Sequence, residues 1–192
     1  MTLHHRFLVK TTFLLLLCLL PFRAEAQQRH SDTVDDILQY APLAASLSLR
    51  LVGVESSIPL KEALLGKCLT AIAVGGTAYI LKHTVNEWRP DHSDRRSFPS
   101  GHTAVVFAGA TSLHKEYGKR SAWISVGGYA LATFIAIDRV AKDRHHWYDV
   151  AAGAAIGIAG TELSYYLAHR LLPSKKLSAS LTPQQIYLCL SF

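Results

Sequence analysis

Long apolar segments alternate with short polar ones along most of this chain. The apolar segments cover about residues 37–54, 64–82, 102–117, 121–138 and 149–171. Alanine, leucine, isoleucine and glycine dominate them, and they lack the strict apolar–polar alternation of a half-buried strand. The pattern therefore predicts five helices that form the body of the protein.

The last predicted helix carries small residues along one face. Gly153, Gly157 and Gly160 recur at spacings of four and three, so they lie near one another on a helical surface. Small residues on one face let a second helix approach closely. We expect this face to pack tightly against a neighbour and not merely to loosen the helix.

The N-terminus has the pattern of an export signal. Residues 1–10 are basic, residues 11–20 are apolar, and Ala24-Glu25-Ala26 places small residues at the two positions that a signal peptidase recognises. We expect a signal peptide over residues 1–26, one helical domain over residues 27–176 and a tail, extended in part, over residues 177–192. An uncleaved anchor helix is the alternative for the first segment.

Composition places the chain between soluble and membrane proteins. Of its 192 residues, 49% are hydrophobic and only 18% are charged, and the formal net charge is +6. A basic balance suits nucleic acid, an anionic membrane surface or an anionic substrate. The sequence has no stripe of Lys and Arg interleaved with aromatic residues, so we expect no nucleic-acid partner.

Cysteine usage adds little to this picture. After removal of the signal peptide, Cys68 and Cys189 remain and could form one disulfide. Cys68 lies inside an apolar segment, however, so we expect it to be a core residue instead. Neither cysteine belongs to a pair with metal-ligand spacing.

The sequence gives two answers on membrane insertion. A spanning helix takes about 20 apolar residues, and no uncharged run after the signal reaches that length. The N-terminus, the 115–120 turn and residues 170–176 are basic, however, and would share the cytoplasmic side. A soluble helical bundle explains the same charges. We favour an exported protein that is membrane-associated on the periplasmic side of the cell envelope.

A first polar cluster joins two cations. Lys82 ends the second apolar segment, and Arg89-Pro90 follows seven residues later. Proline keeps the preceding residue out of the helical conformation, so Arg89 is predicted on an extended segment over the helix end. An ammonium and a guanidinium held together can bind a phosphate. A solvated helix terminus is the alternative for this pair taken alone.

A second cluster, Pro99-Ser100-Gly101-His102, precedes the third apolar segment. The N-terminus of a helix offers free N–H groups and partial positive charge to an anion. Ser100 can cap that helix and donate to a phosphate oxygen, while Gly101 allows close backbone approach. His102 would then stand at the edge of the anion, where a general acid is needed. An ordinary capping turn is the alternative.

A third cluster contains Arg139, His145 and Asp149. If a helix has begun by His145, the spacing of four places His145 and Asp149 on one face. A carboxylate bonded to one imidazole nitrogen fixes the tautomer and leaves the other nitrogen free to attack. His146 would point elsewhere, which makes it the weaker nucleophile. A surface His–Asp pair of little consequence is the alternative.

Together the three clusters resemble the type 2 phosphatidic acid phosphatase superfamily, which includes lipid phosphate phosphatases, bacterial acid phosphatases and vanadium haloperoxidases. Its motifs are Lys-x6-Arg-Pro, Pro-Ser-Gly-His and Ser-Arg-x5-His-x3-Asp. The matching residues are Lys82…Arg89-Pro90, Pro99–His102 and Arg139…His145…Asp149. The resemblance covers about residues 37–171 and implies an all-α bundle of about five core helices with the active site at one end.

The resemblance also implies a role for each residue. The phosphate oxygens would contact Lys82, Arg89, Ser100, Gly101 and Arg139. His145 would attack phosphorus to give a phosphohistidine, Asp149 would orient it, and His102 would protonate the leaving oxygen and then activate water. The family phosphatases imply no metal and no other cofactor. The implied activity is a metal-independent phosphomonoesterase acting on lipid phosphates or diphosphates, with a soluble acid phosphatase as the alternative.

Two features of the sequence bear on how closely the chain follows the family pattern: the residue before Arg139 and the length of the loop between Pro90 and Pro99. Asp138 stands where the family has serine, and a carboxylate there could pair with Arg139 or Lys142, point away, or repel the phosphate. The loop between Pro90 and Pro99 is short, at eight residues, and we expect one of its two adjacent arginines, Arg95 or Arg96, to meet a substrate head group.

Two further alternatives remain. A vanadium haloperoxidase would use the same residues, but the chain is short for that group. An inactive phosphate-binding membrane protein is supported only by the carboxylate of Asp138.

Overall fold

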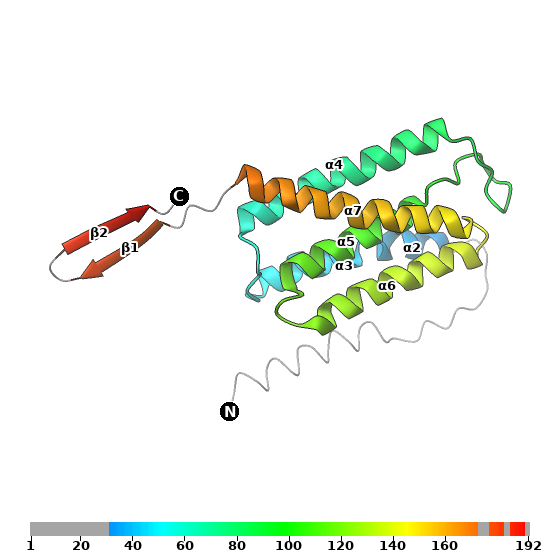
Figure 1. Cartoon of the computed structure of the whole chain (residues 1–192). Helices are drawn as coiled ribbons and strands as arrows, with labels where there is room; N and C mark the ends of the chain where they lie inside the picture. The colour runs from blue at the N-terminus through cyan, green and yellow to red at the C-terminus, as the bar shows by residue number, and fades with distance from the viewer. Residues whose placement is uncertain (1–30, 173–176, 183–184, 191–192) are drawn as a thin grey trace, which may run out of the picture.

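The protein is a bundle of helices followed by a small hairpin (Figure 1). The computed structural model describes residues 31–172, 177–182 and 185–190, so the expected signal peptide lies outside the described residues. The helices are α2 (Ser31–Leu38), α3 (Ala41–Leu51), α4 (Leu60–Thr84), α5 (Gly101–Tyr117), α6 (Ala122–Ala141) and α7 (Trp147–Leu171). The strands are β1 (Leu177–Thr182) and β2 (Gln185–Leu190), which pair antiparallel with Thr182 opposite Gln185.

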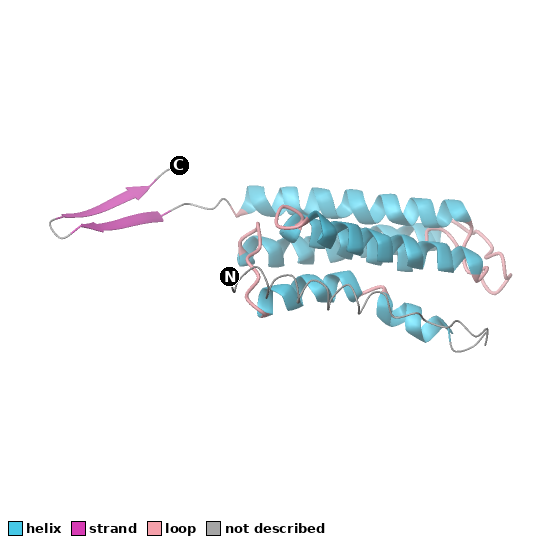
Figure 2. Ribbon diagram, turned by 90° about the horizontal axis from the view of Figure 1, so that it is seen from below, coloured by secondary structure: helices cyan, strands magenta, loops and turns pink. Residues whose placement is uncertain are grey.

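The predicted helical bundle is confirmed, with α5 at its centre. Helix α5 packs against α3, α4, α6 and α7, and the long helices run side by side with loops at both ends (Figure 2). Its inward residues Val106 and Ala110 are fully buried against Ala132 and Ile135 of α6. This central position gives α5 few exposed residues and fixes its N-terminus at one end of the bundle.

Most of the first predicted segment, 37–54, forms α3, but its first two residues belong to a separate helix, α2, which the pattern did not predict. Helix α2 ends at Leu38, and α3 begins at Ala41 with Pro42 in its first turn. Proline fits the first turn of a helix because the N–H that it lacks would have no partner there. The break separates α2 from α3, and α2 contacts α5.

Helix α4 has an unusual distribution of residue sizes. Its buried face carries small or medium-sized residues at Gly66, Thr70, Val74 and Ala78. Large apolar residues point outward instead; Ile72, for example, is 71% exposed. Such an arrangement suits close helix packing with an apolar surround.

The expectation that Cys68 is a core residue is wrong. Cys68 is exposed on the outer face of α4. Because this helix is apolar on every side, the sequence pattern could not distinguish its inner face from its outer one.

The predicted close packing of the α7 glycines is confirmed. A Cβ atom on Gly153 would lie 2.5 Å from the carbonyl oxygen of Ser100, and one on Gly160 would lie 2.7 Å from Val74 Cγ2. Gly157 meets the backbone of Ala104 and Ala108 in the same way. The contacts of Gly153 and Gly157 hold α7 directly against the first half of α5, and that of Gly160 holds it against α4. This packing positions the residues of the site described next.

Candidate active site

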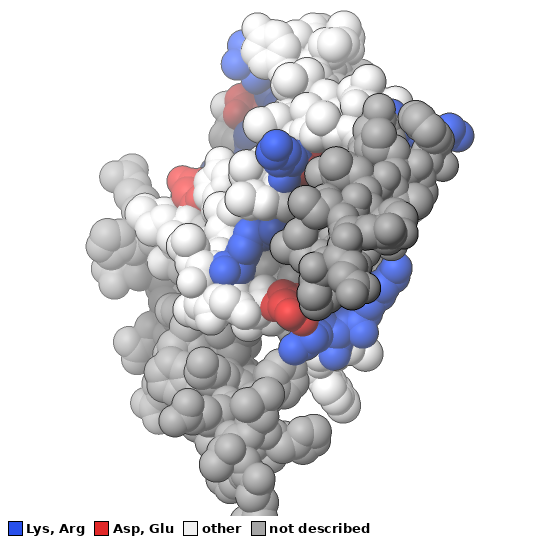
Figure 3. All heavy atoms as spheres, turned by 90° about the vertical axis from the view of Figure 1, so that its left-hand side faces the viewer, with Lys and Arg blue, Asp and Glu red and all other residues white. Residues whose placement is uncertain are grey.

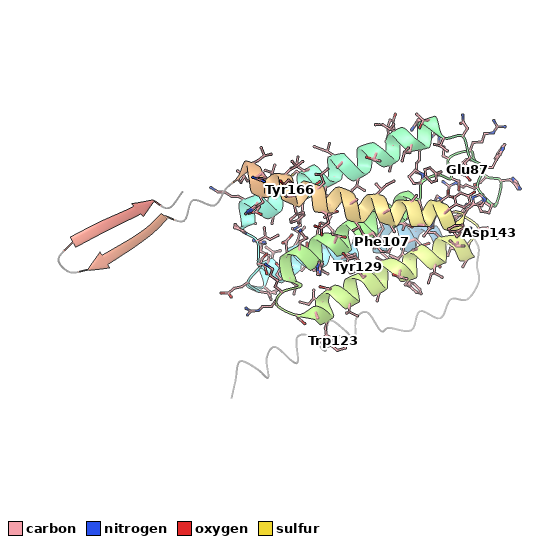
Figure 4. The ribbon with its side chains drawn as sticks, viewed as in Figure 1. Glu87, Phe107, Trp123, Tyr129, Asp143 and Tyr166 are labelled. Carbon is pink, nitrogen blue, oxygen red and sulfur yellow. The ribbon has the colours of Figure 1, made fainter. Side chains whose placement is uncertain are left out.

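The three polar clusters meet at one end of the bundle. They lie at the C-terminal ends of α4 and α6, in the loops that follow these helices, and at the N-termini of α5 and α7. Side chains crowd this end in Figure 4, where Glu87 and Asp143 mark the two loops, while Trp123 and Tyr166 lie toward the opposite end. Residues far apart in the sequence are therefore gathered into one region.

Lys82 lies over the turn that starts α5. A Cβ on Gly101 would be 3.6 Å from Lys82 Cε, and Lys82 Nζ donates a hydrogen bond to the carbonyl of Arg96 at 2.9 Å. Ser100 is fully buried and caps α5, because its Oγ accepts from Thr103 N. The first two clusters thus touch, with the lysine ammonium beside a helix N-terminus.

Arg89 is held by the short loop between Pro90 and Pro99. Its Nε forms an ion pair with Asp94 Oδ1 at 3.0 Å, and its backbone N–H donates to the Asp94 carbonyl at 3.1 Å. Burial would raise the pKa of Asp94, but hydrogen bonds from the Arg89 side chain and the Arg96 backbone outweigh it and lower that pKa. The loop therefore presents a guanidinium oriented by its own carboxylate.

Arg139 is 3% exposed near the end of α6. Its Nη1 lies 3.2 Å from Asp35 Oδ2 of α2, and Lys142 Nζ approaches the same oxygen at 2.7 Å. A carboxylate thus neutralises part of the positive charge at this side of the site.

His145 is buried just after the end of α6, where the charges of Arg89, Lys82 and Arg139 act on it. It is 2% exposed, and its backbone N–H donates to the carbonyl of Arg139 at 3.3 Å. Burial, followed by the positive charges of Arg89, Lys82 and Arg139, lowers the pKa of His145 to about 3. Its imidazole is therefore neutral at physiological pH, with a lone pair available for attack.

Asp149 is fully buried beside this imidazole. Its Oδ2 lies 3.7 Å from His145 Nδ1, which is ion-pair range but too long for a hydrogen bond. The same oxygen accepts from Ser97 Oγ at 2.5 Å and from His146 N at 2.9 Å. The other oxygen, Oδ1, and His145 Nδ1 have no hydrogen-bond partner among the described residues.

The expectation that His146 points elsewhere is wrong. Its Nδ1 lies 3.4 Å from Asp149 Oδ2, because α7 begins only at Trp147 and His146 is its N-cap. Neither histidine is on a helical face, so spacing alone could not separate them. Burial does separate them, because the side chain of His146 is 32% exposed and its ring stacks on Tyr148.

His102 contacts a residue that the sequence did not single out. Its Nε2 lies 2.6 Å from Asp36 Oδ1 on α2. Burial lowers the pKa of His102 and Arg139 lowers it further, while Asp36 and Asp35 act in the opposite direction. The general-acid candidate thus lies between a guanidinium and a pair of carboxylates.

Asp138 pairs with Lys142, which is one of the arrangements that the sequence allowed. Its Oδ2 lies 2.5 Å from Lys142 Nζ in an i,i+4 ion pair. The carboxylate is therefore paired with a cation of its own helix end.

Sequence reasoning missed Asp35, Asp36, Asp94 and Ser97. The two residues of α2 lie more than 60 positions from their partners, and no motif spacing connects them. Asp94 and Ser97 lie in the short loop, where polar residues are ordinary. Only the folded geometry identifies these contacts.

One group of side chains in the described part of the chain has the spacing of metal ligands. It consists of Glu87, His146 and Asp149, whose ligand atoms lie within 4.8 Å of one another. Glu87 Oε1, however, accepts from Tyr148 OH, and Asp149 Oδ2 accepts the two bonds described above. These oxygens already have donors, so the group serves better as a hydrogen-bond network.

An apolar groove reaches the site end of α6 and α7. It has a volume of about 550 Å³ and lies where α6 and α7 diverge beside α5. Its lining includes Phe107, Ile137, Val140, Trp147 and Val150. Val140 directly follows Arg139, and Trp147 lies two residues after His145. The groove thus begins one or two residues along the chain from Arg139 and His145, and its lining is apolar.

Comparisons with known proteins agree with this architecture. A lipid A 1-phosphatase of Porphyromonas gingivalis is 41% identical over 136 residues, which are 70% of this chain but only 31% of that protein. A probable diacylglycerol pyrophosphate phosphatase of Schizosaccharomyces pombe is 35% identical over 89 residues, covering 41% of this chain and 31% of that protein. The chain thus spans about a third of the length of these relatives.

A solved structure shares the fold. The crystal structure of Aquifex aeolicus LpxE superposes with a TM-score of 0.55 at 24% sequence identity, covering 72% of this chain and 88% of that one. The model of the PAP2 superfamily matches residues 63–173, which contain all three clusters. With most of its helical bundle inside that match, this chain belongs to the PAP2 superfamily.

Proposed function

We propose that this protein is a metal-independent phosphomonoesterase that hydrolyses lipid phosphates or diphosphates through a phosphohistidine on His145. The observation that carries the proposal is a buried, neutral imidazole under the influence of the positive charges of Lys82, Arg89 and Arg139, at the end of the bundle that an apolar groove reaches. Cations that converge on one point bind the equatorial oxygens of a transferring phosphoryl group. The neutral imidazole is then the nucleophile at its centre.

In the first step His145 attacks phosphorus. Asp149 lies on the Nδ1 side of the ring, so Nε2 supplies the electron pair. The new P–N bond forms as the bond from phosphorus to the ester oxygen breaks, and His102 gives its proton to that oxygen. The lysine and the two arginines stabilise the charge of the transferring group.

The second step returns the enzyme to its starting state. Neutral His102 takes a proton from water, and the water oxygen attacks phosphorus. The P–N bond breaks, its electron pair returns to His145, and inorganic phosphate leaves. Asp149 stabilises the imidazolium character of His145 through both steps, as an oriented carboxylate does in hydrolytic triads.

A lipid is the favoured substrate class. The groove offers an apolar surface at the same end of the bundle as the cations, as a phosphate on an acyl or prenyl chain requires. The relatives named above are a lipid A 1-phosphatase and a diacylglycerol pyrophosphate phosphatase. A phosphate on a lipid head group, with its chains in or near the groove, fits both the surface and these relatives.

We further propose that the bundle is embedded in a membrane. Helices α4 and α6 are long and apolar enough to cross one, since their 25 and 20 residues extend about 37 and 30 Å against a hydrocarbon core of about 30 Å. Large apolar side chains also cover the outside of the bundle, including Ile72, Phe134 and Trp147. A soluble acid phosphatase would not need that surface.

The orientation follows from charge. Figure 3 shows several exposed Lys and Arg side chains at the end opposite the site; Lys115, Arg120 and Arg170 lie at this end, near the C-termini of α5 and α7. Basic residues favour the cytoplasmic side, so the phosphate site would face the periplasm of an exported chain.

Phosphate release from the detergent-purified full chain tests the activity. A long-chain lipid phosphate, a prenyl diphosphate and a soluble aryl phosphate should be compared, with and without EDTA and vanadate. We expect the lipid esters to be preferred, EDTA to have no effect and vanadate to inhibit. Phosphate binding without turnover on any ester would instead support an inactive binding protein, and halide oxidation with peroxide after adding vanadate would support a haloperoxidase.

A matched pair of variants tests the role of the groove. Ala151 lines the groove, and Ala159 is exposed on the same helix outside it. Ala151→Phe should lower turnover of the long-chain lipid while leaving the soluble ester unchanged, and Ala159→Phe should change neither. Equal loss on both esters in Ala151→Phe would remove the groove from substrate binding.

A further inference from the structure

Helix α2 places two neighbouring carboxylates on two different residues of the site. Asp36 Oδ1 lies 2.6 Å from His102 Nε2, and Asp35 Oδ2 lies 3.2 Å from Arg139 Nη1. Both residues precede the 63–173 region that matches the family. The family motifs therefore leave the function of α2 unassigned.

We propose that Asp36 is a positioning residue, which orients His102 and keeps it protonated for its role as general acid. This inference rests on the proposed function. The hydrogen bond occupies Nε2 of His102, so Nδ1 is the nitrogen left to donate to the leaving oxygen. The site would then use two His–carboxylate pairs, one for the nucleophile, with Asp149, and one for the acid, with Asp36.

His102 needs such a partner because its surroundings oppose its charge. The charged groups that face it are Arg139 from α6 and the two carboxylates of α2. Burial and the Arg139 guanidinium both lower the pKa of His102, whereas Asp36 raises it through a hydrogen bond and through its charge. Without the carboxylate, a smaller share of His102 would carry the proton that the leaving oxygen requires.

The geometry separates this role from a purely structural one. The side chain of Asp36 is 60% exposed, while that of His102 is 23% exposed. An exposed ion pair contributes only about 0–1 kcal/mol to stability, so the fold should tolerate loss of the carboxylate. Its effect should instead appear in the protonation of His102.

Titration of His102 tests the contact directly. Imidazole resonances of the detergent-purified full chain are followed by NMR against pH after ¹⁵N-histidine labelling, and His102→Gln assigns the signal. We expect a lower pKa for His102 in Asp36→Asn than in the native chain, with partial recovery in Asp36→Glu. Glu162→Gln, which removes an exposed carboxylate paired with Lys115 at 2.7 Å, should leave it unchanged. An unaltered His102 pKa in Asp36→Asn would overturn the proposal.

Leaving-group dependence gives a second, independent readout. The 4-nitrophenolate of an aryl ester leaves without protonation, whereas the alkoxide of an alkyl ester needs a proton from a general acid. A general acid contributes about 10²- to 10⁴-fold to rate, so we expect Asp36→Asn to lower kcat by about tenfold or more on the alkyl ester and much less on the aryl ester. Equal losses would mean a structural role, and a gain in activity would mean that α2 blocks the site; either result overturns the proposal.

The two readouts also keep this proposal separate from the proposed function. If the native chain hydrolysed neither ester, the proposed function would fail. The NMR titration would still decide whether Asp36 controls the protonation of His102, because it requires no turnover.

Discussion

Each end of the bundle contains a fully buried carboxylate, and the two carboxylates differ in how many of their oxygens have a partner. At the end away from the site, fully buried Glu116 of α5 is matched by Lys67, by Arg50 at 3.1 Å and by Tyr165 OH at 2.8 Å. At the site end, Asp149 is equally buried, but its Oδ1 has no hydrogen-bond partner among the described residues. Both oxygens of Glu116 therefore have partners, whereas Asp149 has one oxygen without a hydrogen-bond partner in the described residues.

This difference distinguishes a structural network from the network of the proposed active site. The Glu116 cluster ties α3, α4, α5 and α7 together and leaves its carboxylate no oxygen for a further group. The site cluster keeps His145 Nδ1 and Asp149 Oδ1 unpaired within the described chain. Unpaired buried groups cost free energy, so they persist where a ligand or a reaction step uses them.

The largest expected effect comes from removing the nucleophile at the site end. His145→Ala should lower phosphate release by about 10⁴-fold or more, because loss of a nucleophile removes the covalent route. The thermal unfolding midpoint should change little by comparison. His169→Ala, at an exposed histidine paired with Glu62 at the other end, should remain active. Full activity in His145→Ala would refute the mechanism.

The corresponding change at the opposite end should act on stability. Glu116→Gln leaves Lys67 and Arg50 without their buried counter-charge, which costs about 3–5 kcal/mol when one partner of a buried pair is removed. We expect a much lower unfolding midpoint by circular dichroism, with turnover per folded molecule nearly unchanged. Glu162→Gln is the exposed control and should cost no more than about 1 kcal/mol. If Glu116→Gln abolished turnover in folded protein, the two ends would not be functionally distinct.

A smaller effect is expected from a change in the packing of α7 against the Ser100 turn of the site. In Gly153→Ala the new methyl would meet the carbonyl of Ser100 at 2.5 Å, so α7 or the Ser100 turn must shift. Overpacking of this kind costs about 1–3 kcal/mol, and we expect a fall in turnover as well as in the unfolding midpoint. Gly127→Ala provides the control, because nothing lies within 4 Å of its added Cβ. Similar behaviour of the two variants would show that α7 does not set the geometry of the turn.

The fold was largely predictable because apolar helices dominate the sequence. Uninterrupted apolar runs located α4 to α7, and the glycines of α7 identified its packing face. The break between α2 and α3 and the outward position of Cys68 were not predictable. The usual rule places apolar side chains inward, and it fails for a helix whose large apolar residues face outward and whose small ones face the core.

The site was predictable only where residues belong to a motif. The sequence identified the cations and His145, which the structure brings together, and their catalytic roles remain predictions. It could not identify Asp36 or Ser97, because each meets its partner only after the chain folds, across 66 and 52 positions. It also misjudged His146, since an assumed helical spacing does not apply before the helix begins.

The effect that should be smallest near neutral pH is a pH dependence of stability that arises at the site end. Burial and the neighbouring cations lower the pKa of His145 from 6.5 to about 3. Between these values the unfolded chain binds a proton at this residue and the folded protein does not, so unfolding is favoured as the pH falls. Above pH 6.5 the contribution to stability is constant, and it is lost progressively toward pH 3.

Unfolding midpoints of the native chain and His145→Ala across pH 4–8 isolate this component, because every other titrating group is common to both. The native chain should lose stability relative to the variant below pH 6.5, and a difference that stays constant with pH would mean that His145 titrates normally in the folded protein.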